Sequence, residues 1–365
     1  MTGRTTDIAI IGAGIAGASL AAAIGDRARV LLIEAETHPG YHSTGRSAAF
    51  WSESYGGPVV QPLTSASADG LAPYLRPRGC LHIADAEGEA ALDALAADFS
   101  GRAPVLEPVD RLALHAWLPG LAPRYARALS EPSCQDIDVA AYHADLLASA
   151  RRAGAKMLTD AEVMNIERKG ATWRLSTRAG PVQAACLVDA AGAWASRIAA
   201  LAGASPIAVT AYRRTVIQLV TEPAAPADLP LIMDALERFY FKPEAGGRLW
   251  LSPHDESECV AQDAAPEEID VATAIDRFEQ AIDWRVVKRE RAWAGLRSFA
   301  PDRAPIYGYD RAVPGFFWFA GQGGFGIQTA PAAAAIGASL LLNAPLPPSV
   351  SHIDVARYGA ERFSG

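Results

Sequence analysis

The sequence of 365 residues predicts an α/β fold, and three observations support this prediction. An apolar run at residues 8–11 leads into a glycine-rich turn, and a helix of small residues follows to about Ile24. A second apolar run occupies residues 29–33. From about residue 209 onward, strand-like and aromatic runs dominate. A chain of this length can bury two cores, so we expect a βαβ unit combined with a strand-rich second domain.

Composition limits the classes of function. Apolar residues make up 50% of the chain and charged residues 20%, as in a globular protein. The formal charge of −8 and the lack of a basic run argue against a nucleic-acid partner. The four cysteines show neither C-x-x-C nor metal-ligand spacing, so we expect reduced thiols and no metal site; they are Cys80, Cys134, Cys186 and Cys259.

The turn after the first strand contains Gly12, Gly14 and Gly17 in the spacing G-x-G-x-x-G. In a βαβ unit the first glycine permits the tight turn and the second lets the backbone approach a pyrophosphate. The third lets the helix pack closely on the strand. The N–H groups at the start of the helix, around Ile15 and Ala16, then face the phosphates.

An acidic residue completes the pattern. Glu34 lies 20 residues after Gly14, at the end of the second strand and just before Ala35. A carboxylate at this place accepts hydrogen bonds from the ribose hydroxyls of an adenosine. The ordered strand, glycines, helix, strand and acid predict a Rossmann-like dinucleotide site. The alternative is a tightly packed βαβ turn without a ligand.

Two uncharged stretches imitate membrane-directed segments. Residues 8–25 resemble a signal peptide, but the motif glycines and Glu34 explain them better. Residues 316–343 are long enough to cross a bilayer, yet glycines 321–326 and Pro331 interrupt them. We expect a strand, a glycine loop and a buried helix there, no membrane span, and a cytoplasmic location.

A polar loop at residues 43–47 is expected to lie near the phosphates and to lead into a helix from about Ser47. Arg46 could supply positive charge there, or could be an exposed turn arginine. Further along we expect an N-cap at Asp138 and a helix end at Gly154. The other expected elements are helices at 88–99 and 111–121 and strands at 79–84, 156–158, 162–168, 172–177 and 181–188.

The last of these strands runs into a second glycine junction, in which Ala191 and Gly192 precede Trp194. Beyond it we expect strands at 211–220, 238–242 and 248–252, a helix at 269–282, and a substrate-binding block that includes 289–298. The motif at Gly12 alone fits NAD, NADP or FAD. The junction at Gly192 and the glycine loop at 321–326 favour FAD, because a flavin ring needs backbone donors around it.

Four sequence blocks carry a family resemblance: residues 8–19, 42–50, 187–195, and 293–308 followed by 319–329. With them the chain resembles the D-amino acid oxidase family of flavoproteins, most nearly the D-arginine dehydrogenase and glycine oxidase types. The resemblance implies an FAD-binding domain of the glutathione-reductase type, built from residues 1–78, 136–208 and 300–365. A mixed or antiparallel sheet would form the substrate domain from 79–135 and 209–299.

The resemblance also implies which residues hold the cofactor. No cysteine or histidine occurs at 321–329, so FAD is expected to be non-covalent, and His42 is expected to be an ordinary loop histidine. The expected cofactor contacts are Gly12, Gly14, Ile15, Ala16, Gly17, Glu34, Ala35, Ser43, Thr44, Arg46, Ser47, Ala48, Ala49, Val163, Ala191, Gly192, Trp194, Gly323, Gly324, Phe325, Gly326, Ile327, Gln328 and Thr329.

On the substrate side, Arg214, Tyr240 and Arg297 match positions that resemble a carboxylate clamp. The simpler alternatives are structural salt bridges for the arginines and a core aromatic for the tyrosine. Phe50 and Cys80 depart from the arginine-oxidising relatives, which tend to have a histidine and a glutamate there. With Tyr55 as a further wall residue, the pocket is expected to take a neutral or apolar side chain.

The expected reaction is oxidation of an amino acid at the carbon–nitrogen bond by hydride transfer to flavin N5. The imino acid then hydrolyses to a keto acid and ammonia. The substrate would be a D-amino acid, glycine or an N-methyl amino acid. The rivals are a 2-hydroxy acid dehydrogenase or oxidase, an electron-transfer subunit of a heteromeric dehydrogenase, and a plain NAD-binding protein. Oxygen or a quinone as electron acceptor, and the oligomeric state, remain open.

Overall fold

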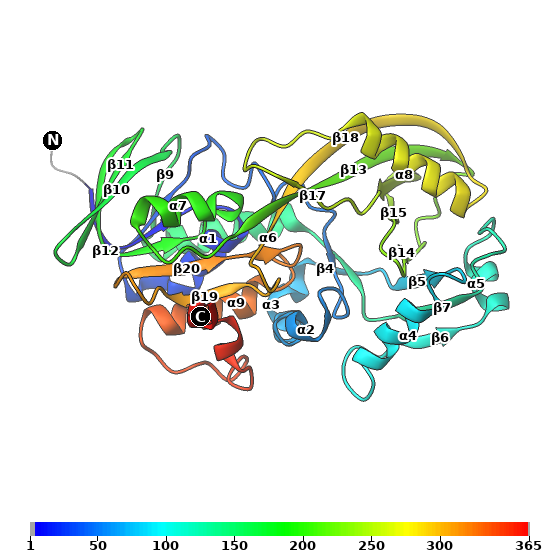
Figure 1. Ribbon diagram of the computed structural model, residues 1–365, viewed down its shortest axis with the longest axis horizontal. Coiled ribbons are helices and arrows are strands. Elements are labelled where there is room, and N and C mark those ends of the chain that lie inside the picture. The colour runs from blue at the N-terminus through cyan, green and yellow to red at the C-terminus, as the bar shows by residue number, and fades with distance from the viewer. Residues whose placement is uncertain (1–3, 364–365) are drawn as a thin grey trace.

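The computed structural model describes residues 4–363, which form two large sheets side by side (Figure 1). The first sheet has eight strands and contains the N-terminal strand at its centre. In spatial order they are β10 (Val163–Lys169), β11 (Thr172–Thr177), β12 (Gly180–Asp189), β1 (Arg4–Ile11), β2 (Val30–Ile33) and β9 (Lys156–Leu158), with β20 (Phe316–Ala320) beside β12 and β19 (Ile306–Tyr309) beside β20.

The predicted βαβ unit is confirmed. β1 pairs in parallel with β2 and β12, and α1 (Ile15–Ile24) connects β1 to β2. All four residues of β2 are buried, as expected for a strand that is covered on both faces. α1 packs between α6 (Val139–Arg152) and α9 (Ala330–Leu341), and small residues on α1 and α9 allow this close approach.

The predicted parallel strand and three-stranded meander are also confirmed. β9 extends the parallel sheet beside β2, and β10, β11 and β12 then run antiparallel to one another. The Asp138 side chain caps α6 by accepting from the backbone N–H of Ala141. β12 leads into a short 3-10 turn (Gly192–Trp194) and α7 (Ala195–Ala202). The return to the parallel sheet therefore ends beside the glycine turn of β1.

The second sheet is mostly antiparallel and lies in the other half of the molecule (Figure 1). Its two longest strands, β13 and β18, pair along most of their lengths. In spatial order the strands are β21 (Gln322–Gly323), β18 (Arg285–Phe299), β13 (Thr210–Glu222), β16 (Arg248–Ser252), β15 (Tyr240–Glu244), β14 (Leu231–Asp234), β5 (Cys80–Ala84), β7 (Arg127–Glu131) and β6 (Glu107–Val109), with β17 (Ser257–Cys259) beside β13.

Helices cover this second sheet and build a separate core. α8 (Glu268–Ala281) packs on β13, β16 and β18, whereas α4 (Glu89–Asp98) and α5 (Arg111–Trp117) pack on β5 and β7. The core beneath α8 is aromatic; Phe278 meets Phe241 edge to face with ring centroids 5.2 Å apart. The predicted helices at 88–99, 111–121 and 269–282 are thus confirmed with small shifts in their ends.

The helix predicted from about Ser47 is wrong. The chain turns sharply at Ala49, whose φ of 57° is incompatible with a right-handed helix, and then forms the short strand β3 (Phe50–Trp51). β3 joins β8 (Gln135–Ile137) and β4 (Leu75–Pro77) in a small third sheet. Helical structure resumes only at α2 (Gly57–Ala66) and α3 (Ala68–Leu71). The pairing of β3 with β8 therefore overrides the local helix propensity of the alanines.

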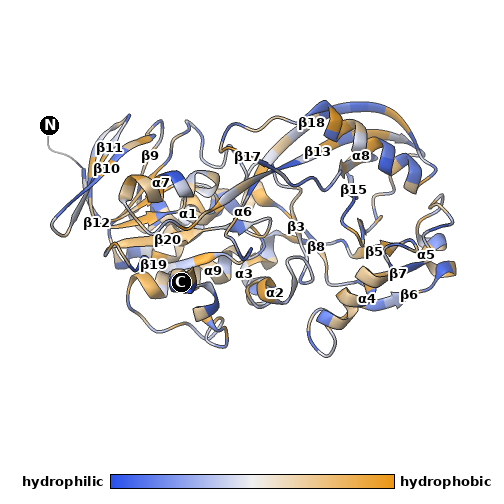
Figure 2. Ribbon diagram, in the orientation of Figure 1, coloured by the Kyte–Doolittle hydropathy of each residue, from blue (hydrophilic) through white to orange (hydrophobic). Residues whose placement is uncertain are grey.

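The predicted strand, glycine loop and buried helix near the C-terminus are confirmed. β20 is wholly buried, and nine of the twelve residues of α9 are buried. Figure 2 shows apolar residues concentrated in β12, β20 and α9. Within residues 4–363, no helix combines the length and the apolar character that a membrane span requires. The uncharged stretch at 316–343 thus supplies β20 and α9 to the hydrophobic core around the first sheet.

Candidate cofactor and substrate site

One cavity of about 460 Å³ brings together most of the predicted site residues. Its wall includes residues of both sheets and of the loops between them. The predicted residues that line it are Gly12, Gly14, Ile15, Ala16, Glu34, Ala35, Ser43, Thr44, Arg46, Ser47, Ala48, Ala49, Phe50, Tyr55, Val163, Ala191, Gly192, Trp194, Arg214, Tyr240, Arg297, Gly323, Gly324, Gly326 and Ile327. Gly17, Phe325, Gln328 and Thr329 are not in its wall.

The glycine turn is packed so closely that side chains cannot fit. Gly12 has a φ of 102°, and a Cβ there would lie 2.4 Å from the carbonyl oxygen of Ala190. A Cβ on Gly17 would lie 1.9 Å from the carbonyl oxygen of Gly12. Gly17 therefore serves helix–strand packing. Ile15 and Ala16, in the first turn of α1, stand at the wall, where N–H groups without intrahelical acceptors can serve a phosphate, although the Ile15 N–H already donates to Thr44 Oγ1.

Glu34 stands at another part of the same cavity. Its carboxylate accepts from the backbone N–H of Ala13 at 2.9 Å and from that of Glu36 at 3.0 Å. The backbone carbonyl of Glu34 accepts from Ala161 N–H at 2.8 Å, which brings the start of β10 and Val163 beside it. These contacts hold the carboxylate in place at the cavity wall, where a ribose hydroxyl can reach it.

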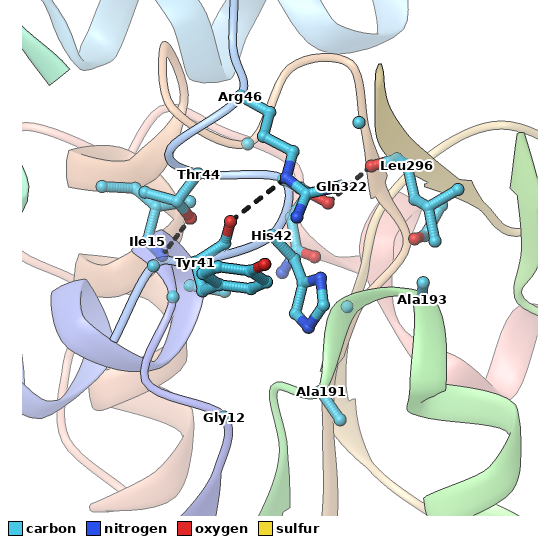
Figure 3. A pocket seen from close by; sticks show the side chains of 18 of the residues that line it. Gly12, Ile15, Tyr41, His42, Thr44, Arg46, Ala191, Ala193, Leu296 and Gln322 are labelled. Atoms are coloured by element: carbon cyan, nitrogen blue, oxygen red, sulfur yellow. Dashed lines mark hydrogen bonds between the residues drawn. The ribbon is translucent and has the colours of Figure 1, made fainter. Parts of the chain in front are cut away.

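The loop between β2 and β3 closes over the start of α1, as Figure 3 shows. The Thr44 hydroxyl accepts from the backbone N–H of Ile15 at 2.9 Å, and Ser43 Oγ donates to the Leu296 carbonyl at 2.6 Å. Arg46 donates to the carbonyls of Ala264 and Ala294 and pairs with Asp263. Arg46 therefore fastens this loop to β18 and to residues 263–264, and it also lines the cavity.

His42 and Tyr41 also line the cavity, and sequence reasoning missed both as site residues (Figure 3). The His42 ring packs on Trp194 with centroids 4.6 Å apart, and its Nε2 lies 3.0 Å from Glu36 Oε1. Its Nδ1 is buried without a hydrogen-bond partner in the described part of the chain. A buried polar atom in a cavity wall is available to a ligand. The signals in the sequence were the position of His42 at the start of the block 42–50 and the proximity of both residues to the loop.

The second glycine junction faces open space. Gly192 has a φ of 55°, and a Cβ placed there would meet nothing within 4 Å, so the cavity approaches its backbone. Asp189 lies just behind, at the end of β12, and accepts from the Ala191 N–H at 3.1 Å. Complete burial of Asp189 raises its pKa to about 8. This carboxyl is therefore predominantly protonated at neutral pH.

Arg297, near the end of β18, extends its guanidinium over the backbone of Gly324. A Cβ on Gly324 would lie 2.3 Å from Arg297 Nη2, so a larger residue there would displace the guanidinium. Nη1 donates to Glu256 at 2.8 Å and Nη2 donates to the Tyr55 hydroxyl at 2.6 Å. Nε is buried and has no partner among the described residues. The guanidinium thus retains a donor for a further acceptor.

Arg214 reaches the same cavity from the neighbouring strand, β13. Its Nε donates to the Asp255 carbonyl at 2.8 Å, while Nη2 is buried without a hydrogen-bond partner among residues 4–363 and lies 3.5 Å from Glu256 Oε1. Burial and the nearby Arg297 cation lower the pKa of Arg214. A carboxylate bound between the two guanidiniums would relieve this repulsion. Tyr240 is buried beside them, and burial raises its pKa, so its hydroxyl stays protonated.

Aromatic rings form the wall beside the two arginines. Phe50 lies between Tyr55 and Tyr240, with ring centroids 5.1 and 6.1 Å away. Cys80 was predicted at a side-chain-recognising position, but it is buried in the hydrophobic cluster behind Tyr240 and is absent from the cavity wall. Its β-strand directs it into the core. Phe50 therefore contributes to the apolar wall directly, whereas Cys80 acts only through packing.

The remaining predicted residues support the wall from behind. Gln328 is buried and donates from Nε2 to the carbonyls of Ser52 and Tyr55, at 3.1 and 3.2 Å. Thr329 Oγ1 donates to the Phe325 carbonyl at 2.8 Å. Phe325 itself packs edge to face on Tyr55, with centroids 5.2 Å apart. The sequence correctly located the loop but did not distinguish lining side chains from buried ones.

His254 lies close to the clamp but outside the cavity wall. Its ring meets Tyr240 edge to face with centroids 5.5 Å apart. Burial and the cations of Arg214 and Arg297 lower its pKa to about 2, so it remains neutral. None of the motifs indicated this position, because the contact depends on the turn after β16.

The cavity brings together the glycine turn of a βαβ unit, the carboxylate of Glu34 and two buried arginines, which is the arrangement expected of a dinucleotide-binding protein. The unpartnered His42 Nδ1 and the open space at Gly192 fit a cofactor that extends past the glycine turn. The family model described as FAD dependent oxidoreductase (DAO) matches residues 7–340, and the chain belongs to this family. FAD is accordingly its cofactor.

Solved structures share the whole fold. Glycine oxidase from Geobacillus kaustophilus superposes with a TM-score of 0.85, at 22% identity, over 99% of this chain and 100% of that chain. L-proline dehydrogenase from P. horikoshii gives a TM-score of 0.82, at 20% identity, over 95% and 96% of the two chains. The predicted α/β fold with FAD-binding and substrate domains is confirmed.

Curated relatives are longer and match a smaller part of the chain. Mouse (Mus musculus) mitochondrial dimethylglycine dehydrogenase is 26% identical over 251 residues, covering 63% of this chain and 29% of that protein. The hydrogen cyanide synthase subunit HcnC of Pseudomonas aeruginosa is 26% identical over 222 residues, covering 60% of this chain and 50% of that protein. The chain therefore aligns with less than a third of the dimethylglycine dehydrogenase.

Proposed function

We propose that this FAD-dependent oxidoreductase oxidises the carbon–nitrogen bond of a small amino acid. The substrate is a D-amino acid with a neutral or apolar side chain, glycine, or an N-methyl amino acid. The observation that carries this proposal is the pair of buried guanidiniums, Arg214 and Arg297, which line the same cavity as the dinucleotide-binding turn. The names of the similar proteins, glycine oxidase, L-proline dehydrogenase and dimethylglycine dehydrogenase, support it.

The two arginines and the tyrosines supply binding and orientation. Nη2 of Arg214 and Nε of Arg297 are unpartnered donors, so a carboxylate can accept from both, and the Tyr240 hydroxyl adds a third donor. When bound, FAD supplies the hydride acceptor. Fixing the carboxylate lowers the barrier by positioning, so a substrate whose amine binds uncharged requires no dedicated base. The released imino acid hydrolyses in water to a 2-keto acid and ammonia.

The wall beside the clamp supports an uncharged substrate side chain. Phe50, Tyr55, Tyr240 and Val216 form it, and none of them carries a charge at neutral pH. A cationic side chain would lose its hydration there without gaining a partner. This argument supports glycine, alanine-sized and apolar amino acids over arginine and lysine.

We also assign domain ranges on the basis of sheet membership. Residues 1–78, 136–208 and 300–365 form the FAD-binding domain, since every strand of the first sheet falls within them. Residues 79–135 and 209–299 form the substrate domain, which contains all strands of the second sheet except β21. The cofactor-binding roles of the lining residues and the substrate-binding roles of Phe50 and Tyr55 belong to the same proposal.

Anaerobic flavin reduction tests the function. The holoenzyme is mixed with D-amino acids, glycine, sarcosine, proline and a matched set of 2-hydroxy acids, and bleaching of the visible flavin band is recorded. We expect bleaching by at least one amine with an uncharged side chain. Bleaching by hydroxy acids alone would replace the proposal with 2-hydroxy acid oxidation. Complete lack of bleaching by amines would refute the proposed oxidation of an amino acid.

A variant connects the activity to the clamp. Arg297→Met removes the guanidinium but keeps a flexible apolar stem, so we expect kcat/KM to fall by two orders of magnitude or more, about 3 kcal/mol for the lost charge-assisted bonds. Arg291→Met serves as the control, because Arg291 lies on the same strand over Trp293 and outside the cavity wall. Equal effects of the two changes would show that the clamp has no specific role.

A further inference from the structure

A short turn between β16 and β17, residues 253–256, lies behind the two clamp arginines. Asp255 fastens it to β13: its carboxylate accepts from the backbone N–H of Thr215 at 2.7 Å and from the Thr215 hydroxyl at 3.0 Å. Its backbone carbonyl accepts from Arg214 Nε, and Arg277 donates to the Pro253 carbonyl at 3.0 Å. The turn is therefore held in place at both ends.

This turn presents Glu256 to three guanidiniums. Glu256 Oε1 lies 2.8 Å from Arg297 Nη1, 2.8 Å from Arg303 Nη2 and 3.5 Å from Arg214 Nη2. Glu256 is not in the cavity wall, so it contacts the arginines from the side away from the cavity. Arg297 Nε and Arg214 Nη2 have no hydrogen-bond partner among the described residues, although Nη2 lies at ion-pair distance from Glu256, and these two atoms are the donors that remain for a ligand.

The charges of this cluster can be counted. Arg214, Arg297 and Arg303 contribute three positive charges, and Asp255 and Glu256 contribute two negative charges, which leaves one positive charge. Neighbouring Arg213 lies outside the cavity wall and pairs with Glu267 and Asp270, and its Nε also lies 4.0 Å from Asp255 Oδ2. One uncompensated positive charge matches one carboxylate group of a ligand.

We propose that Glu256 is a positioning residue that sets the clamp to accept a single carboxylate and thereby excludes dicarboxylic substrates. It orients Arg297 for its contact with the ligand and cancels the charge that a second carboxylate would need. This inference deepens the proposed function and rests on it for the identity of the substrate. Removing the charge of Glu256 while keeping its acceptor oxygen should make the site favour dicarboxylates.

The test compares acetate with malonate, which differ by one carboxylate and cannot be oxidised at a carbon–nitrogen bond. Their dissociation constants are measured on the holoenzyme through the change in the flavin absorption spectrum. In Glu256→Gln the amide oxygen still accepts from Arg297, and the net charge rises from one to two. We expect the preference for malonate over acetate to rise about tenfold, the size of one charge-assisted contact. Glu256→Ala should weaken the binding of both anions.

Glu267→Gln is the matched control, because it removes one carboxylate that pairs with Arg213 outside the cavity wall. Its malonate preference should stay within twofold of the wild type. If Glu256→Gln does not retain flavin, Arg303→Gln tests the charge count in reverse: it lowers the net charge to zero and should shift the preference toward acetate. An unchanged ratio in Glu256→Gln, or the same ratio as in Glu267→Gln, would overturn the inference.

Turnover with amines is a separate measurement. If the wild type bleaches with glycine, Glu256→Gln should raise kcat/KM for iminodiacetate relative to glycine in the same direction as the malonate ratio. If no amine is oxidised, the proposed function fails, but the anion-binding ratio still tests the role of Glu256.

Discussion

Replacing Gly12 with alanine should expel the cofactor before it unfolds the protein. The φ of 102° disfavours any residue with a Cβ, which costs about 1–2 kcal/mol. The new Cβ would lie 2.4 Å from the Ala190 oxygen, whereas ordinary contacts begin at 3.4 Å, so the two segments must separate by about 1 Å. Overpacking of this kind costs about 1–3 kcal/mol. The sum, about 2–5 kcal/mol, is smaller than the stability of most domains.

The separation acts directly on the cavity, because Ala190 precedes the lining residues Ala191 and Gly192. We expect Gly12→Ala to be folded but to lose most of its FAD on dialysis, measured as the ratio of flavin to protein absorbance. Gly203→Ala is the control: its φ is 67°, it ends α7, and a Cβ there meets nothing within 4 Å. A Gly12→Ala protein that retained as much flavin and the same Tm as Gly203→Ala would refute this reasoning.

Two further predictions concern buried carboxyl groups. Burial raises the pKa of Asp189 to about 8, so its protonated form is favoured in the folded state and stability is lost as the pH rises from 3.8 through 8. Asp189→Asn should therefore raise Tm more at pH 8 than at pH 5, and an equal gain at both would contradict this. Burial of Glu131 opposes its ionisation, but hydrogen bonds from His82, Ser54 and Ser52 outweigh this and lower its pKa. The ionised Glu131 therefore stabilises the folded protein at pH values above 4.5, which is its pKa in the unfolded chain. This stabilisation is lost as the pH falls below 4.5. Glu131→Gln should cost about 3 kcal/mol in urea unfolding at pH 7 and flatten the acid branch of the stability curve, whereas a change under 1 kcal/mol would argue against a buried charge.

The sequence predicted those structural features that depend on residues close together in the chain. The strand, glycines, helix and acid of the first βαβ unit occupy the places that their spacing predicted, and so do the N-cap at Asp138 and the meander from β10 to β12. The helix predicted from Ser47 failed because β3 pairs with β8, which lies about 85 residues away in sequence. Propensity cannot foresee a partner strand at that separation.

The site residues also fall into two groups: those whose position follows from a short segment, and those whose surroundings come from distant segments. Gly12, Gly14 and Glu34 were predictable because turn geometry and the position of one acid are properties of a short segment. Arg46 and His42 line the cavity, but their partners could not be predicted from the sequence. The former bonds to carbonyls of residues 264 and 294, and the latter depends on Trp194 and Glu36 for its surroundings.

The sequence alone therefore determined the class of fold, the glycine turn and the cofactor type, since these follow from periodicity, spacing and a family pattern. Only the tertiary structure decided which donors of Arg214 and Arg297 lack a hydrogen-bond partner, because the two arginines lie on β13 and β18 while their partners arrive from the turn at residues 253–256 and from Tyr55. Hydrogen-bond partners and net charge at a site are sums over segments distant in sequence. They exist only after the chain has folded.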